Sequence, residues 1–149
     1  MTSLSDQVVA ARGGLLLGAK TLAAKRLASG KATVKLAAFE GGEFADAERA
    51  LGRAKIDAEW DIFVMDRLDA KNAEGREIQR AHYLMANEPY QRVLTEYRQA
   101  ERTRNGLRTA ALTADVEAKA EQVRYDAVCR ALSALVALVG TVSDVIEAE

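Results

Sequence analysis

One short segment of the chain nearly spells a phosphate-binding loop. Gly13 and Gly18 stand in the stretch GGLLLGAKT, but Ala19 separates the second Gly from Lys20. A P-loop places its Lys directly after that Gly, so that the ammonium group reaches the β- and γ-phosphates while loop amides cradle them. No convincing strand precedes the segment either. We therefore interpret it as a helix face of small residues, on which Gly14 and Gly18 allow a close packing contact.

The single histidine and the single cysteine do not form a recognisable metal or nucleophile motif. A di-iron helical bundle uses Glu-x-x-His, whereas Glu77 and His82 are differently spaced, and zinc would need further His or Cys ligands. Cys129 lies in an apolar stretch, while a catalytic thiol needs a nearby base and some exposure. We predict no catalytic residue, metal or cofactor, and we interpret Cys129 as a small buried hydrophobic residue.

A dense group of acidic side chains lies in the middle of the chain. It lacks the Asp-x-Asp-x-Asp-Gly spacing of a calcium loop, and its members do not share one helix face. We interpret it as the solvated side of a helix, since basic residues are interleaved with it. The acids are Asp57, Glu59, Asp61, Asp66 and Asp69.

The basic residues near the N-terminus are the group with the most plausible ligand. Residues 1–38 carry six basic side chains and one acid, whereas the rest of the chain is net acidic. These cations could contact the phosphates of nucleic acid or of an anionic membrane, although no aromatic residues lie between them to stack on bases. We favour pairing with acids of the protein and keep polyanion binding as the alternative. The candidate contacts are Lys20, Lys25, Arg26, Lys31 and Lys35.

The composition predicts an all-α fold. The 149 residues contain one Pro and 5% aromatic residues, and good helix formers such as Ala, Leu, Glu and Arg dominate. The length indicates one domain, residues 1–149, and the content of 49% apolar and 29% charged residues argues against disorder. A β-sandwich or barrel would need many Gly/Pro turns and β-branched runs, which are missing.

Several features indicate a cytoplasmic protein, or part of a particle that is assembled in the cytoplasm. One cysteine allows no intramolecular disulfide. The first residues lack the basic and apolar regions of a signal peptide. The longest uncharged apolar stretch, 131–143, is shorter than the roughly 20 residues that span a membrane.

Three helices are expected along the chain. The first runs from about Leu4 to Ala28 and ends at Ser29–Gly30. Residues 31–40 alternate in polarity like a strand, yet lack an obvious partner, so that a helical turn or extended connector is preferred. Gly41–Gly42 marks a break, and a second helix follows from about Glu43 to Ala86. Around Trp60 its apolar residues point nearly all round, which indicates cover on several sides.

The third helix carries the strongest pattern in the sequence. It starts at the Asn87–Glu88–Pro89 turn and runs to about Ile146, with the alternative that Asn105–Gly106 interrupts it. Alternating steps of three and four residues from Tyr90 trace an apolar seam that resembles a coiled coil. The seam positions, apolar except for Arg104 and Glu121, are Tyr90, Val93, Tyr97, Ala100, Arg104, Leu107, Ala111, Ala114, Ala118, Glu121, Tyr125, Val128, Leu132, Leu135, Val139, Val142 and Ile146.

These elements predict a long antiparallel helical hairpin over residues 43–147, with its turn near 87–89. Folding about that turn places Leu68 opposite Arg108 and Leu51 opposite Tyr125. The basic N-terminal helix and connector, residues 1–40, would then pack at the base of the hairpin over 131–145. We expect interface positions at Gly14, Gly18, Leu132, Leu135, Val139 and Val142.

These predictions favour a structural function. We expect a non-enzymatic protein that acts through helix–helix contacts, either as a homo-oligomer or with other helical proteins in a larger assembly. The alternative is an adaptor whose basic N-terminal segment binds nucleic acid or an anionic membrane. An enzyme with a site formed between subunits is a further alternative.

Overall fold

A computed structural model describes the backbone of residues 4–64 and 71–147, and the side chains of residues 6–64 and 71–137. Over these ranges the chain is helical and has no strand, which confirms the all-α class. The elements are α1 (Leu4–Phe39), the π-helix η1 (Glu40–Phe44), α2 (Ala45–Val64), α3 (Ala73–Ala86) and α4 (Glu88–Glu147). They divide into two compact units, Met1–Thr33 with Ala110–Glu149, and Val34–Thr109.

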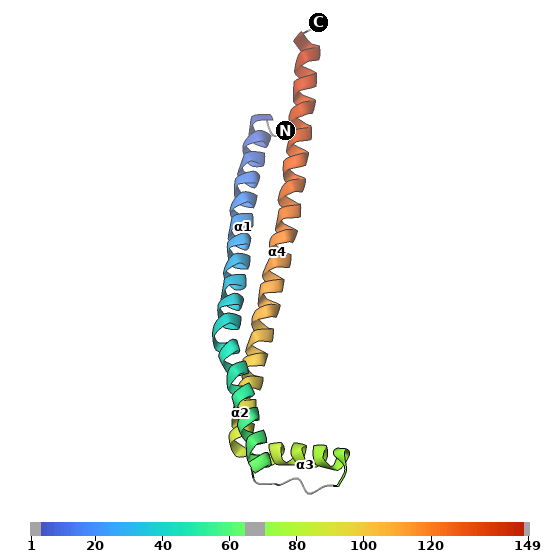
Figure 1. The fold of residues 1–149 in the computed structure, drawn as a ribbon. Helices are drawn as coiled ribbons and strands as arrows, with labels where there is room; N and C mark the ends of the chain where they lie inside the picture. The colour runs from blue at the N-terminus through green and yellow to red at the C-terminus, as the bar shows by residue number, and fades with distance from the viewer. Residues whose placement is uncertain (1–3, 65–70, 148–149) are drawn as a thin grey trace. The chain divides into compact units, whose positions relative to one another are not determined.

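In the first unit, α1 and α4 pair as antiparallel arms (Figure 1). Near the start of α1, Val8 and Leu15 share a groove with Leu132 of α4. Farther along α1, the Lys25 ammonium lies 2.6 Å from a carboxylate oxygen of Glu117. Residues farther along α1 thus contact residues nearer the start of α4, so the two helices run in opposite directions.

The seam between these two arms is built mainly from small residues. The buried side chains of this unit, within the described part of the chain, are Leu22, Ala111 and Ala118. Together with Leu22, covered positions of α1 recur in steps of three and four, at Ala11, Leu15, Gly18, Lys25 and Ser29. On α4 the corresponding positions are Ala111, Ala114, Ala118, Glu121 and Tyr125, which follow the predicted seam, and Cys129 then replaces Val128. The paired helices therefore bury little apolar surface between them.

The first helix does not end at Ser29–Gly30 as predicted. It continues to Phe39, so residues 31–39 are helical and the strand alternative is wrong. One Gly inside a helix costs only about 1 kcal/mol relative to Ala, which packing of the neighbouring turns offsets. The Thr33 hydroxyl donates to the Ser29 carbonyl at 3.0 Å, a bond that this residue type makes within continuous helix.

Gly41–Gly42 does not break the chain but lies in the π-helix η1. A π-turn holds one residue more than an α-turn and therefore rotates the side chains that follow it. Here the exposed residue is Glu43 and the buried one is Phe44. The extra residue thus directs an aromatic ring, rather than a carboxylate, toward the interior of the second unit.

Phe44 is the aromatic anchor of the second unit. Its side chain is 5% exposed, and its ring lies 5.8 Å from that of Tyr97 on α4. The Arg104 guanidinium sits 4.2 Å from the centroid of the Phe44 ring, within the range of a cation–π interaction. Ala58 and Ile62 of α2 are the other buried residues among the described side chains of this unit.

The predicted second helix is two helices in the structure. The first, α2, ends at Val64, and α3 begins at Ala73 after a cap in which the Asn72 side chain accepts a hydrogen bond from the Gly75 amide at 2.7 Å. Within the second unit, α3 projects sideways from the end of α2 (Figure 1).

The start of α4 confirms the predicted turn. The Asn87 side chain accepts a hydrogen bond from the Tyr90 amide at 2.9 Å, and Pro89 lies in the first turn, where a missing amide proton costs nothing. The helix then runs without interruption through Asn105–Gly106 over 60 residues.

The predicted pairing register within the hairpin is wrong. Tyr125 contacts Gly18 of α1 rather than Leu51, and Leu68 lies outside the described residues. The error arises because Ala73–Ala86 forms the separate helix α3 instead of extending the arm. The first helix does reach α4 near Leu132, as expected, but it continues along α4 as far as Glu117.

We expect Phe44→Ala to lower the free energy of unfolding by about 3–5 kcal/mol, because it removes a buried aromatic ring. Phe63→Ala is the matched control, since Phe63 is 75% exposed and its loss should change stability by only about 0.5 kcal/mol. Urea unfolding followed by circular dichroism at low protein concentration measures both. Equal losses in the two variants would contradict the role assigned to Phe44.

Candidate functional site

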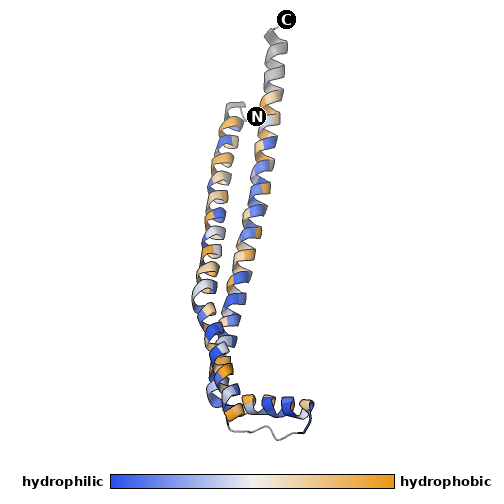
Figure 2. Ribbon diagram, in the orientation of Figure 1, coloured by the Kyte–Doolittle hydropathy of each residue, from blue (hydrophilic) through white to orange (hydrophobic). Residues whose placement is uncertain are grey.

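Large aliphatic residues lie on the side of α1 that faces away from its seam with α4. We define the α1 outer face as Val9, Leu16, Lys20 and Leu27; its three aliphatic side chains are exposed. They are spaced by about two and three helical turns, which aligns them on one side of the helix. Hydrophobic positions recur along α1 in Figure 2. The larger apolar side chains of this segment are therefore mostly outside, while small ones form the seam.

The part of α4 in the first unit repeats this arrangement. Leu112, Val116 and Val123 are exposed and lie on the side opposite Ala111 and Ala118. We call these three residues the α4 outer face. A helix that is apolar on two opposite sides is typical of one that packs between two neighbours.

A third apolar surface lies on α2 in the second unit. We define the α2 apolar face as Ile56, Trp60, Phe63 and Val64, all of which are exposed, with Trp60 at 63%. The rings of Trp60 and Phe63 lie 5.7 Å apart. Ala58 and Ile62 on the opposite side of the helix are buried. The cover that the sequence predicts around Trp60 is thus present on one side of α2 only.

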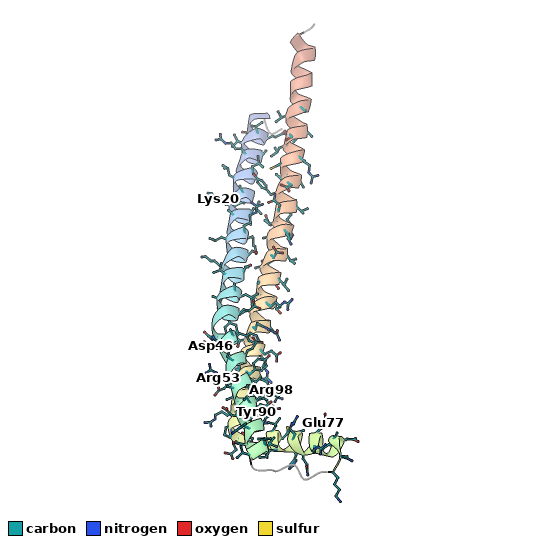
Figure 3. All side chains as sticks on the ribbon, in the orientation of Figure 1. Lys20, Asp46, Arg53, Glu77, Tyr90 and Arg98 are labelled. Carbon is teal, nitrogen blue, oxygen red and sulfur yellow. The ribbon has the colours of Figure 1, made fainter. Side chains whose placement is uncertain are left out.

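The predicted polyanion contacts do not act as one group. Lys25 pairs with Glu117, and the Arg26 guanidinium donates a hydrogen bond to the Gln122 side-chain oxygen. Lys20 points away from α4 (Figure 3). Across the described side chains, Lys20, Lys31 and Lys35 have no ion-pair partner.

The predicted interface residues also divide. A β-carbon added to Gly18 would lie 3.3 Å from Cδ2 of Tyr125, whereas one added to Gly14 would meet no atom within 4 Å. Leu132 and Leu135 line an apolar groove of about 360 Å³ together with residues near the start of α1. The side chains of Val139 and Val142 fall outside the described residues.

Tyr125 is linked to the one cysteine by a side-chain hydrogen bond. This bond to Cys129, one helical turn away, raises the pKa of Tyr125 above its ordinary value of 10.0, because the protonated phenol makes the bond. Negative charge on Cys129 and on Asp126 acts in the same direction. Cys129 is half-buried rather than buried as predicted. It is also a polar partner of Tyr125 in the seam.

The other residues considered for chemistry are dispersed. His82 is exposed on α3, and Asp57 and Asp61 are exposed on α2, while Asp66 and Asp69 lie outside the described residues. Within residues 4–64 and 71–147, no cluster of His, Cys, Asp or Glu side chains could hold a metal ion. Over the same ranges, none of the helices combines the length and apolar character needed to cross a membrane.

The three outer apolar faces were not predicted from the sequence. The signal was present as spacing: Ile56, Trp60 and Phe63 follow steps of four and three residues. It was hidden because the aliphatic residues of α1 occur on several sides of the helix, and the pattern on α4 was assigned to one seam only. The outer faces become visible once the seam fixes which side of each helix is covered.

Comparison with known proteins does not indicate a function, so the apolar surfaces described above are the basis for proposing one. No protein-family model matches the chain, and no curated protein or solved structure matches it either.

We expect Gly14→Ala to raise the free energy of unfolding by about 0.5–1 kcal/mol, because Ala favours helix and the new methyl group meets open space. Gly18→Ala should gain clearly less, since the Tyr125 ring must shift to admit the methyl group. Thermal or chemical unfolding of the two variants measures the difference. An equal gain at both positions would show that Gly18 does not set the approach of the two helices.

We expect Cys129→Ala to lower the pKa of Tyr125 toward 10.0 by removing the hydrogen bond. Because the folded-state pKa lies above the unfolded one, the stability from this bond is complete below pH 10 and is lost as pH rises through the folded-state pKa. Absorbance of tyrosinate during alkaline titration reports the change, with Tyr125→Phe variants subtracted to remove the other tyrosines. An identical titration with and without Cys129 would refute the link.

Proposed function

We propose that this chain is a non-enzymatic assembly protein whose helices pack against further helices of other subunits. The observation that carries the proposal is the position of the large apolar residues. On α1 and α4 of the first unit, the seam is built mainly from small residues, whereas Val9, Leu16 and Leu27 and the α4 outer face lie exposed on the opposite sides.

The energetics of burial favour this proposal. Covering one exposed Val or Leu side chain stabilises a complex by about 1.5–3 kcal/mol before the cost of association. Six such residues lie on the two outer faces of the first unit. Their recurrence along one side of each helix suits a long partner helix better than a compact ligand, and coiled-coil-like packing is the mode we propose.

Polyanion binding through the N-terminal segment is less well supported. Lys25 and Arg26 already contact α4 within the unit, so two of the five candidate cations are engaged. Lys20 stands between Leu16 and Leu27 on the α1 outer face. An apolar surface with a few cations resembles the core and rim of a protein interface more than a phosphate-binding groove.

We expect the full chain to form oligomers that persist at high salt, because burial of apolar surface is not screened by ions. The triple variant Leu112→Gln, Val116→Gln, Val123→Gln should have a lower mass with unchanged helicity. Light scattering coupled to size exclusion, over a series of protein and salt concentrations, measures the mass. The control is Thr113→Gln with Ala120→Gln, two exposed positions beside the α4 outer face. A monomer under every condition would overturn the proposed function.

A further inference from the structure

The charges around the exposed apolar faces of α1 and α2 are opposite in sign. From Gln7 to Phe39, α1 contains six basic residues and no acid. From Ile56 to Val64, α2 contains three acids, Asp57, Glu59 and Asp61, and its nearest preceding basic residues are Arg53 and Lys55. Each segment also presents large exposed apolar side chains. The two faces are therefore both apolar, while the charges around them are opposite in sign.

The cations on the α1 outer side are available for a partner. Lys20 points away from α4 (Figure 3), and over the described part of the chain neither Lys20 nor Lys31 has an ion pair. Both lysines are exposed and lie on the same stretch of helix as Leu16 and Leu27. Basic side chains therefore border an apolar stripe that the chain itself leaves uncovered.

The acids on α2 are likewise available. Asp57 and Asp61 are exposed and line a groove that also contains Arg53 and Arg92. Among the described side chains, neither acid lies within 4.0 Å of a basic group. Glu59, on the other flank of the α2 apolar face, is half-buried and also lacks an ion pair of this kind.

We propose that the basic α1 outer face of one copy docks on the acidic α2 apolar face of a second copy. This inference rests on the proposed assembly function and names the two surfaces that meet. Leu16 and Leu27 would cover Trp60 and Phe63, while Lys20 and Lys31 approach the α2 acids at the rim. Apolar contact supplies the buried centre, and opposite charge selects the partner face.

Charge also decides against one of the simpler symmetric pairings. Two α1 outer faces brought together would oppose lysine with lysine, whereas α2 carries Arg53 and Lys55 beside its three acids. Like charges placed across an interface are unfavourable. Contact between two different faces is heterologous, so each copy can bind one neighbour through α1 and another through α2, which generates a ring or an open filament.

Paired charge reversals test this contact in the full chain. One variant carries Lys20→Glu and Lys31→Glu, and the other carries Asp57→Lys and Asp61→Lys. Each alone presents two faces of the same sign, so its apparent Kd for self-association should rise at least about tenfold. An equal mixture of the two should regain association, because each variant then supplies the face that the other needs. A single chain with all four changes should also associate.

Trp60 gives a direct readout of the α2 apolar face, because it is the only tryptophan of the chain. Its emission should shift to shorter wavelength as wild-type protein concentration rises, and this shift should be lost in each double variant and restored in the mixture. The matched controls reverse charges on exposed positions of α3: Arg76→Glu with Arg80→Glu, and Glu74→Lys with Glu77→Lys. They should associate like the wild type.

The possible outcomes separate this contact from the proposed function. Wild-type oligomers whose mass is unchanged by either double variant would leave the assembly function standing and overturn the α1–α2 contact. Folded variants that stay dissociated when mixed would also overturn it. A Trp60 emission that does not depend on protein concentration would show that no second copy covers that face, against the proposal. A wild-type chain that is monomeric throughout would overturn both.

Discussion

Close approach of two helices along a seam of small residues is the constraint on which the first unit depends. Ala111, Ala118 and Gly18 bring the α1 and α4 backbones near each other, and the Tyr125 ring fills the space beside Gly18. Such a seam admits Leu22 and part of Leu15, but most large aliphatic side chains of these segments lie on the outer sides. The close packing of the two helices and their exposed apolar surfaces therefore have the same cause. Small residues on one side of each helix allow the approach, and the large apolar residues remain on the other side.

The second unit solves the packing problem differently. Phe44 lies against Tyr97 and beneath the Arg104 guanidinium. One large aromatic ring therefore packs the helices of this unit together, whereas a row of alanines does so in the other unit. Arg104 also explains how a charged residue can occupy a seam position: its guanidinium lies over an aromatic face, where a cation is stabilised. The apolar surface that remains, around Trp60, is aromatic and bordered by acids, whereas the surface of α1 is aliphatic and bordered by lysines. The two units thus offer different surfaces to a partner.

Local chemistry made part of the fold predictable. The Asn87 cap and Pro89 located the start of α4, and the steps of three and four residues located its seam from Tyr90 to Tyr125. The glycines were harder, because Gly30 and Gly41–Gly42 have the same local signature as a helix end, and only packing decided that the chain continues through them. Gly14 and Gly18 are likewise indistinguishable in sequence, yet only Gly18 faces a ring. The register failed because the predicted second helix was carried through Asn72, which is the cap of the separate helix α3, and this error displaced every pairing that was counted from the turn.

The π-helix at Glu40–Phe44 has the form of a single-residue insertion that the arm has absorbed. Up to Phe39 the half-buried positions keep one phase, and from Phe44 onward they keep another. A mismatch of this kind confines the effect of a length change to one turn, because the residues on either side retain their own facing. Gain or loss of one residue in this arm can therefore be accommodated by forming or erasing a π-turn, without rebuilding the contacts at both ends. A one-residue change in length is in this sense a local event, confined to the turn at Glu40–Phe44.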